Sequence, residues 1–335
     1  MFYAGAFQEI EGKVGLKNLN FYEKTCIMTV KEYSMELRSF DGKKIYVHEW
    51  LDVENPKGVV QIVHGMAEHA ARYDAYARYL NEHGYIVIAD DHRGHGKTDY
   101  DSLGYAKGDM FANTVRDEAG ITDYYQRKYA GLSYFLFGFS YGSFLTQSYI
   151  GKYGDKLDGV VIAGSNYKKD FEVYLGTVVA SLKCLIGGAK APAKLLEKLS
   201  FGAWAKHFED GQWLSTDDEN NAKYADDPLC GFTCSYRFYK DFFKGLRSLY
   251  TRSYCERLRR DLPVLVVSGK EDPVGEMGEG VKKLVRFYRE KIGMEDAELV
   301  LFENSRHEFL NEKTDTKHKW ETPLKFFDKI CAEKE

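Results

Sequence analysis

Residues 138–142, Gly-Phe-Ser-Tyr-Gly, form the stretch of this sequence best suited to covalent chemistry. The run before it is short, apolar and aromatic-rich without a helical period, which predicts a buried strand; the run after it predicts a helix to about Lys152. A sharp turn between a strand and a helix lifts a serine hydroxyl above the edge of a sheet. We therefore predict that Ser140 is a nucleophile and that the Tyr141 N–H, in the first helical turn, points to where an oxyanion forms.

A serine nucleophile needs a base to accept its proton and an acid to orient that base, because a serine hydroxyl is a poor nucleophile at neutral pH. A bare Gly-x-Ser-x-Gly also arises by chance in a chain with 31 glycines, so these partners decide its meaning. Asp272 and His307 each lie in a loop after a predicted strand, and the order Ser, Asp, His suits a nucleophile in such a turn. Glu271 is the adjacent rival for the acid, and we expect Asp272 to be the residue that reaches His307.

A second oxyanion donor is expected in the loop after the apolar run 59–63, where His64, Gly65 and Met66 stand. Gly65 permits close approach of the backbone, so we predict that the Met66 N–H pairs with that of Tyr141. His64 is interpreted as a brace for this loop. A hydrogen-bonded scaffold beneath the site is predicted for three further polar residues, Asp91, Arg93 and His95.

Apolar runs typical of strands alternate with amphipathic runs typical of helices over most of the chain. Strands are predicted near residues 33–39, 44–51, 59–63, 85–89, 133–139, 157–163, 263–268 and 298–302. Helices are predicted near residues 71–82, 110–128, 141–152, 280–292 and 317–331. This alternation indicates an α/β fold, with a mostly parallel sheet covered by helices on both faces.

The alternation stops between residues 165 and 255, where helical patches and scattered aromatic residues show no clear strand. We predict a helical cap over 165–255, inserted into a core formed by residues 33–164 and 256–335. An insertion at this point lies above the carboxyl ends of the strands, where open α/β sheets bind ligands. Residues 1–32 form an N-terminal extension to which no role is assigned.

Length and composition limit the classes of function. A chain of 335 residues with 44% apolar residues suits two domains, or one large domain with an insertion. The net charge of −4, without a long basic stripe, argues against a nucleic-acid partner. The six cysteines are interpreted as reduced thiols of a cytoplasmic protein, and Cys230 and Cys234 lack the second pair or neighbouring histidines of a zinc site. We expect no metal, no signal peptide and no apolar run that spans a membrane.

Five motifs in order carry a family resemblance, namely HGMAEH at 64–69, DHRGHG at 91–96, GFSYG at 138–142, DPV at 272–274 and RHE at 306–308. Together they resemble the monoacylglycerol lipase and lysophospholipase branch (serine aminopeptidase S33-type) of the α/β-hydrolase superfamily, over about residues 33–335. The resemblance implies an α/β-hydrolase fold with an eight-stranded sheet and a helical cap after the sixth strand. It also implies an acyl-binding tunnel, hydrolysis of carboxylic esters through an acyl-enzyme, and no cofactor.

The resulting expectation is a serine hydrolase of single-chain lipid esters, either monoacylglycerols or lysophospholipids. Two alternatives stay open. One is an aminopeptidase of the proline-iminopeptidase type, whose substrate amine would be held by acidic cap residues, here Glu209, Asp217, Asp218 and Glu219. The other is a catalytically silent protein that binds a small apolar ligand on the same scaffold. Head group, acyl length and oligomeric state are not predicted, since function lives in the site rather than in the fold.

The cap contains apolar residues that predict an amphipathic helix, namely Val178, Val179, Leu182, Leu185 and Ile186. We expect this face to pack on the body of the protein, with contact to a membrane surface as the alternative. The cap aromatics are expected to divide between pocket lining and cap core, and they are Trp204, Phe208, Trp213, Phe232, Tyr236, Phe238, Tyr239, Phe242 and Phe243.

Overall fold

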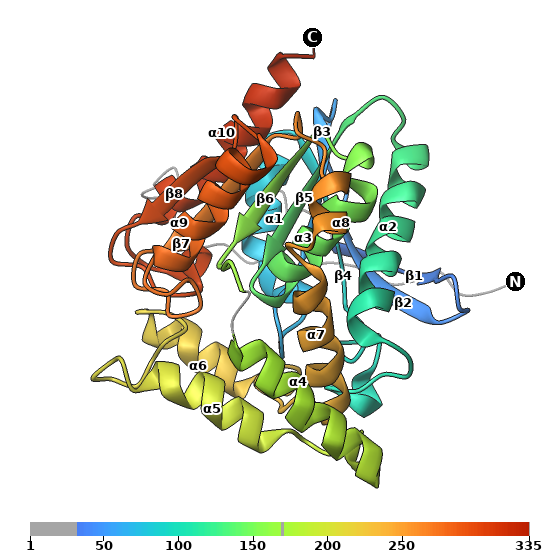
Figure 1. The fold of residues 1–335 in the computed structure, drawn as a ribbon. Helices are drawn as coiled ribbons and strands as arrows, with labels where there is room; N and C mark the ends of the chain where they lie inside the picture. Colours follow the sequence, from blue (N-terminus) through green and yellow to red (C-terminus); the bar gives the residue numbers. More distant parts are fainter. Residues whose placement is uncertain (1–31, 169–170, 335) are drawn as a thin grey trace, which may run out of the picture.

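The computed structural model describes residues 32–168 and 171–334, so the predicted extension 1–32 lies outside these residues except for Glu32. An eight-stranded sheet forms the centre, in the order β1-β2-β4-β3-β5-β6-β7-β8 (Figure 1). The strands are β1 (Glu32–Arg38), β2 (Lys44–Trp50), β3 (Gly58–Val63), β4 (Tyr85–Asp90), β5 (Ser133–Phe139), β6 (Gly159–Ala163), β7 (Val264–Gly269) and β8 (Glu298–Phe302). β2 pairs antiparallel with β1 and β4, and the other neighbours are parallel. The predicted fold class is confirmed.

Helices bury the parallel strands on both faces. In β3, Val59 and Val63 join one apolar core while Val60 and Ile62 join the other, because successive side chains of a strand point to opposite faces. The Val60 face is covered by α1 (Asp74–Glu82) and α10 (Thr316–Ala332). The Val59 face is covered by α2 (Met110–Lys128), α3 (Tyr141–Tyr153) and α9 (Glu279–Arg286).

Most predicted elements form within a few residues of the expected bounds. The two runs around Asp41 and Gly42 form the β1–β2 hairpin. The first predicted helix begins as a 3₁₀ turn and continues as α1, and the helix predicted to residue 292 is α9 followed by a π-helical segment. The short helical segments are the 3₁₀ turns Ala70–Tyr73, Tyr100–Ser102, Gly154–Lys156 and Phe309–Asn311 and the π-helical Cys184–Gly188 and Phe287–Ile292.

Helices occupy the described chain between β6 and β7, at the place predicted for the cap. They are α4 (Phe171–Lys183), α5 (Lys194–Ala205), α6 (Asp218–Asp226), α7 (Tyr236–Ser248) and α8 (Arg252–Arg257). In Figure 1, α4, α5 and α6 lie beyond one end of the sheet, and α7 runs from them toward the body. Because α7 packs against both α4 and α2, it ties the inserted helices to the core. The division into a core and a separate cap domain stays a prediction.

Two further observations concern the described residues alone. No helix among them combines the length and apolar composition needed to cross a bilayer. Their five cysteines are all free, and Cys26 lies outside the described part of the chain.

Candidate active site

Ser140 lies at the sharp turn between β5 and α3. Its φ of 53° and ψ of −119° put a non-glycine residue in a backbone region that side chains rarely adopt. The flanking glycines have no room for a side chain. A Cβ at Gly138 would lie 2.1 Å from Thr146 Oγ1, and one at Gly142 would lie 1.9 Å from a backbone oxygen, Val63 O. Packing at this turn therefore requires the Gly-x-Ser-x-Gly pattern.

The structure brings Ser140, His307 and Asp272 into one hydrogen-bonded row. Ser140 Oγ lies 2.8 Å from His307 Nε2, and His307 Nδ1 lies 2.9 Å from Asp272 Oδ1. Asp272 is fully buried, and its carboxylate also accepts hydrogen bonds from the Val274 N–H (2.8 Å) and the Ser268 hydroxyl (2.9 Å). Three donors hold the carboxylate in one orientation, which keeps His307 Nε2 turned toward the serine.

The loops after β7 and β8 meet at Gly269. A Cβ there would lie 2.1 Å from Arg306 O, so only glycine lets the two loops approach this closely. The Glu271 N–H continues the contact by donating to Ser305 O at 2.9 Å. The side chain of Glu271, the rival for the acid, is partly exposed, and Asp272 is the residue that contacts the histidine.

The loop after β3 also approaches Ser140. A Cβ on Gly65 would lie 3.2 Å from Ser140 Cβ, and the Gly65 N–H donates to Glu68 Oε1 at 2.5 Å. Met66 and Tyr141 both line the pocket beside the serine. Tyr141 is the first residue of α3, where backbone N–H groups have no partner within the helix. These positions suit the two predicted oxyanion donors, whose role stays a prediction.

His64 braces this loop, as predicted. Its Nδ1–H donates to Gly65 O at 2.8 Å, and its Nε2 accepts the His92 N–H at 3.1 Å. Burial, reinforced by the charge of the neighbouring His92, holds the pKa of His64 well below its usual range. A neutral imidazole has one donor and one acceptor, and both are used here.

Arg93 and His95 belong to a buried polar scaffold, also as predicted. Arg93 forms ion pairs with Asp117 at 2.5 Å and Asp41 at 2.6 Å, and His95 Nδ1 lies 3.1 Å from Arg93 O. Burial lowers the pKa of His95 to about 3, so this ring is neutral. Neither residue contacts Ser140 directly, which agrees with a supporting role.

Asp91 is the third scaffold residue and ties two loops together. It accepts the backbone N–H groups of Ala70 (3.0 Å) and Lys97 (2.7 Å), and His48 Nε2 lies 3.4 Å away. Burial alone would raise its pKa, but the hydrogen bonds with His48 and the two N–H groups outweigh it and lower the pKa to about 2. The charged carboxylate is thus part of the folded state.

A pocket of about 230 Å³ opens above Ser140 and His307. Its apolar lining is Met66, Ala67, Phe139, Phe144, Trp204, Trp213, Leu214, Phe232, Phe242 and Val274, and its acidic lining is Glu68, Glu197 and Glu308. The cap aromatics therefore divide as expected. Trp204, Trp213, Phe232 and Phe242 line the pocket, whereas Phe238 and Tyr239 are among the buried residues of the core.

Two groups among the described residues have the composition of metal ligands, namely His69 with Asp227 and Cys230, and Asp90 with His92 and Glu118. The prediction of no metal rested on sequence distance, which missed the neighbouring His69. His69 Nε2 lies 2.8 Å from Asp227 Oδ2, and burial raises the pKa of the Cys230 thiol, which therefore keeps its proton. Burial and the Asp90 charge raise the pKa of Glu118 well above its usual range, which favours its protonated form, and His92 Nδ1 lies 3.1 Å from Asp90 Oδ1 and 3.3 Å from Glu118 Oε1.

Comparison with known proteins identifies the family. Residues 54–314 match the family described as serine aminopeptidase S33. The chain belongs to this family. A monoacylglycerol lipase of Mycolicibacterium smegmatis is 27% identical over 271 residues, 81% of this chain and 88% of that protein. Human monoglyceride lipase is 34% identical over 102 residues, 30% of this chain and 33% of its own length.

A solved structure extends the comparison. The thermostable carboxyl esterase of Bacillus coagulans, crystallised in complex with glycerol, superimposes with a TM-score of 0.82 at 27% identity. The likeness covers 90% of this chain and 100% of that one. With the family match, these findings support the predicted enzyme class, a carboxylic ester hydrolase.

Sequence reasoning missed several residues that support the site. Ser268 donates to Asp272, and Glu68 accepts from the backbone of Gly65. The available signal for Ser268 was its place near the end of a predicted strand, four positions before the acid. The available signal for Glu68 was its place as a carboxylate in the loop after the apolar run 59–63, where an oxyanion donor is predicted.

Two Gly→Ala substitutions, one at the turn of Ser140 and one on α2, are expected to change the free energy of unfolding in opposite directions. Gly142→Ala is expected to lower the free energy of unfolding by about 3 kcal/mol or more, since its Cβ meets backbone that cannot move aside. The control, Gly120→Ala on the exposed face of α2, has open space and is expected to raise it by about 0.5–1 kcal/mol. Urea unfolding of both variants checks this, and equal shifts would contradict the packing argument.

The lowered pKa of Asp91 predicts a pH-dependent stability. Its contribution is present above the unfolded pKa of about 4 and is lost as the pH falls toward 2. The gap in unfolding free energy between wild type and Asp91→Asn should therefore narrow by about 1 kcal/mol between pH 7 and pH 3. Urea midpoints at the two pH values measure the gap, and an unchanged gap would show that Asp91 is not held ionised.

Proposed function

We propose that the protein is a serine esterase that cleaves single-chain lipid esters through an acyl-enzyme on Ser140. One observation carries the proposal: Ser140, His307 and Asp272 form a hydrogen-bonded row at the floor of an apolar pocket. An apolar pocket with few polar groups suits an acyl chain, and the row suits attack on the ester carbonyl that the chain would place there.

Each residue has a role in this mechanism. Ser140 Oγ attacks the carbonyl carbon while His307 Nε2 takes the hydroxyl proton, and Asp272 stabilises the resulting imidazolium. The N–H groups of Met66 and Tyr141 hold the oxyanion. His307 returns the proton to the leaving alcohol, and a water molecule then attacks the acyl-enzyme by the same proton transfers. His307 moves every proton in these steps, so the proposal assigns no cofactor.

The acidic lining favours an uncharged head group. Glu68, Glu197 and Glu308 are among the residues that line the pocket, and Arg72, which pairs with both Glu68 and Glu308, brings one positive charge against their two negative charges. A phosphodiester would be repelled, whereas glycerol hydroxyls can donate to carboxylates. We therefore favour a monoacylglycerol over a lysophospholipid, in line with the names of the relatives.

The aminopeptidase alternative keeps some support from the family description but little from the cap acids. Asp217 lies at the N-terminus of α6, and both it and Glu219 contact Lys313 rather than the pocket. Glu209 and Asp218 are exposed. A substrate amine would have to use Glu197, which accepts a hydrogen bond from the Thr233 hydroxyl at 2.6 Å.

The first experiment measures hydrolysis of p-nitrophenyl esters from acetate to palmitate. We expect activity to peak at medium or long chains, because longer chains bury more surface in the pocket. Ser140→Ala should lower kcat/KM by at least about 10³-fold, since the nucleophile is lost. The matched control is Ser102→Ala, a half-buried serine of the 3₁₀ turn Tyr100–Ser102 whose hydroxyl donates to Tyr105 O at 3.2 Å.

The outcomes separate the alternatives. Activity on acetate alone would contradict the acyl pocket, and preferential cleavage of aminoacyl amides would support the peptidase. If Ser140 fails to react with a fluorophosphonate probe, the esterase proposal is wrong and the silent binding protein takes its place.

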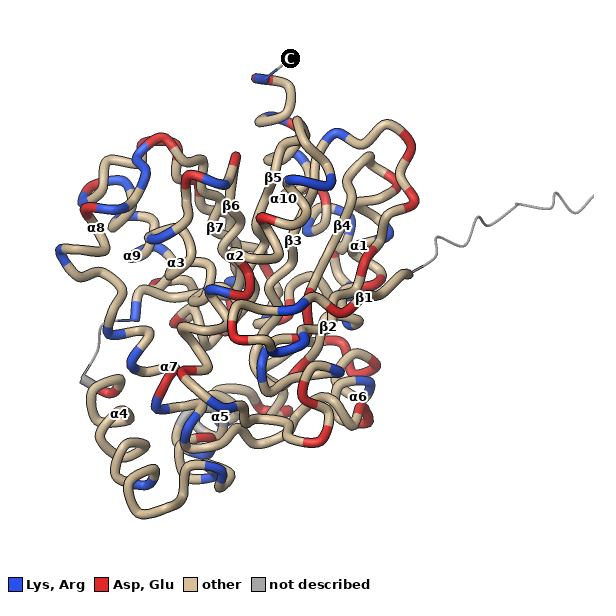
Figure 2. The backbone as a smooth tube through the Cα atoms, turned by 90° about the vertical axis from the view of Figure 1, so that its right-hand side faces the viewer, with Lys and Arg blue, Asp and Glu red and all other residues tan. Residues whose placement is uncertain are grey.

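We also propose that the protein is cytoplasmic, which its free cysteines support, and that its cap contacts a membrane surface. The expected packing of the apolar cap face on the body is wrong for its outer residues: Leu182, Leu185 and Ile186 are 57%, 79% and 76% exposed. Leu195 and Leu199 of α5 are exposed as well. Figure 2 shows α4 as a largely uncharged helix at one end of the molecule. Exposed lysines adjoin this patch, namely Lys194 and Lys198, which suits an anionic bilayer.

Vesicle binding tests the membrane contact. The double variant Leu185→Ser/Ile186→Ser should bind vesicles of phosphatidylcholine and phosphatidylserine at least about tenfold more weakly than wild type. The reason is that it lacks the two apolar side chains that are transferred from water to the bilayer on binding. Its activity on a short soluble ester should not change. Tyr100→Ser, an aromatic residue 62% exposed outside the cap, is the control and should bind like wild type. Equal binding by all three proteins would contradict the contact.

A further inference from the structure

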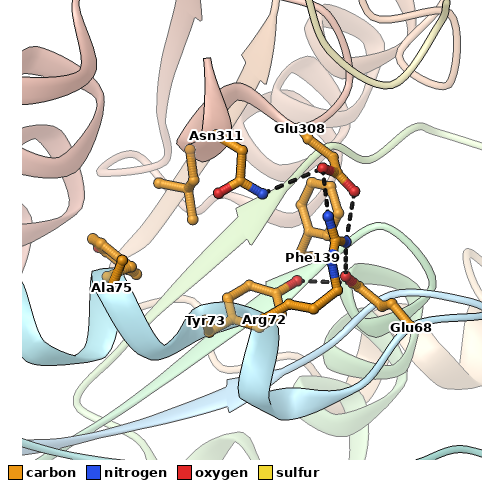
Figure 3. A pocket seen from close by; sticks show the side chains of 9 residues that line it. Glu68, Arg72, Tyr73, Ala75, Phe139, Glu308 and Asn311 are labelled. Atoms are coloured by element: carbon orange, nitrogen blue, oxygen red, sulfur yellow. Dashed lines mark hydrogen bonds and ion pairs between the residues drawn. The ribbon is translucent and has the colours of Figure 1, made fainter. Parts of the chain in front are cut away.

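Arg72 is the centre of a buried ion cluster that the proposed mechanism does not use (Figure 3). Its Nη1 donates to Glu68 Oε2 at 2.5 Å and to Glu308 Oε1 at 2.7 Å, and its Nη2 donates to Glu308 Oε2 at 2.8 Å. The side chains are 11%, 4% and 3% exposed for Arg72, Glu68 and Glu308. Figure 3 shows the guanidinium between the two carboxylates, one from the loop after β3 and one from the loop after β8.

The cluster needs an explanation other than stability. Desolvating three charges costs several kcal/mol per ion, and packed apolar residues of the same volume are often equally stabilising. Such a cluster is more valuable for orientation, because the planar fork of an arginine fixes the carboxylates that it pairs. The question is therefore what Glu68 and Glu308 hold in place.

Glu68 holds the backbone that carries the proposed oxyanion donor. Its Oε1 accepts the Gly65 N–H at 2.5 Å and the Tyr73 hydroxyl at 2.9 Å, while Oε2 is the oxygen that Arg72 binds. Ala67, between this backbone and Glu68, has a φ of 55°, which L-residues seldom adopt. The direction of the Met66 N–H therefore depends on where the Glu68 carboxylate is held.

Glu308 holds the loop of the proposed base. It directly follows His307, and its N–H donates to Leu214 O of the cap at 2.7 Å. Its Oε2 also accepts Asn220 Nδ2 of α6 at 2.7 Å. Burial raises the pKa of Glu308, but the charge and hydrogen bonds of Arg72 outweigh it and lower the pKa to about 2, so the pair is ionised at neutral pH.

We propose that Arg72 is a positioning residue. It holds the loop after β3, which carries the proposed oxyanion donor Met66, at a fixed position relative to the loop after β8, which carries the proposed base His307. The inference rests on the esterase proposal and deepens it. Ser140 lies between these two loops, so attack and proton transfer require both at their proper distance from one hydroxyl. The ring of Tyr224 from α6 lies 4.9 Å from the Arg72 guanidinium, which brings the cap into the same cluster.

The test uses conservative variants of the full chain. Arg72→Lys keeps the charge but loses the two-pronged fork, and Glu308→Gln keeps the shape but loses the charge. Each should lower kcat by about 10–100-fold with KM changed less than about threefold, because a misplacement near 1 Å already costs this much. Active sites are counted by fluorophosphonate titration, so unfolded protein does not lower the measured kcat.

A double variant and a control variant test whether Arg72 acts by positioning the two loops. The double variant Arg72→Lys/Glu308→Gln should have a kcat within about twofold of that of the slower single variant, since both changes break the same contact. The control Arg78→Lys alters an Arg–Asp pair with Asp74 on neighbouring α1 and should leave kcat per active site within about twofold of wild type.

Each outcome decides a separate question. Lower stability of Arg72→Lys and Glu308→Gln with kcat per active site unchanged would overturn the positioning role and leave a structural ion cluster. Additive losses in the double variant would also overturn it. Absence of ester hydrolysis by the wild type would instead defeat the esterase proposal.

Discussion

The strained turn at Ser140 is the constraint on which the rest of the site depends. A positive φ at a residue with a side chain costs free energy, and it persists only where the surrounding structure holds it. Here β5 enters the turn fully buried and α3 leaves it with its first turn against β3, so neither end can relax. In this strained conformation the serine hydroxyl points toward His307, and the N–H of the next residue, Tyr141, lies at the N-terminus of α3. In the proposed mechanism, both groups act on the same carbonyl group.

The parallel sheet supplies the other groups because its strands end at one edge. The loops after β3 and β8 reach Ser140, and the loop after β7 reaches His307. Glycine permits the close approach of the β3 loop to Ser140 at Gly65 and of the β7 loop to the β8 loop at Gly269. A buried carboxylate is tolerated only if its oxygens are bonded, and Asp272 obtains bonds from Ser268 near the end of β7 and from Val274 in its own loop. The acid is thus oriented by local sequence before the histidine contacts it.

This local origin explains how much the sequence could predict. Strands, sheet class and the meeting of Ser140, Asp272 and His307 were predictable, because each of these three residues follows a recognisable apolar run. Arg72 and Glu308 were not, because they are 236 positions apart and meet only when two loops fold against each other. The exposure of Leu185 was mispredicted for another reason: an apolar helix face has the same sequence pattern whether it packs on the protein or faces outward.

The contacts of the cap limit how substrate can enter. Ala67 O accepts hydrogen bonds from the Gly231 N–H at 2.9 Å and the Tyr224 hydroxyl at 3.1 Å, and Glu308 binds Asn220. An opening that displaced α6 would break these contacts and release the loops that carry the proposed oxyanion donor, Met66, and the proposed base, His307. Trp204 of α5 also lines the pocket, and exposed leucines lie on α5 and on α4. For the proposed esterase, entry beside α5 would leave the loops of Met66 and His307 in place, so the end of the molecule proposed to contact a bilayer is also the end through which an acyl chain could pass without breaking the contacts of Ala67 and Glu308.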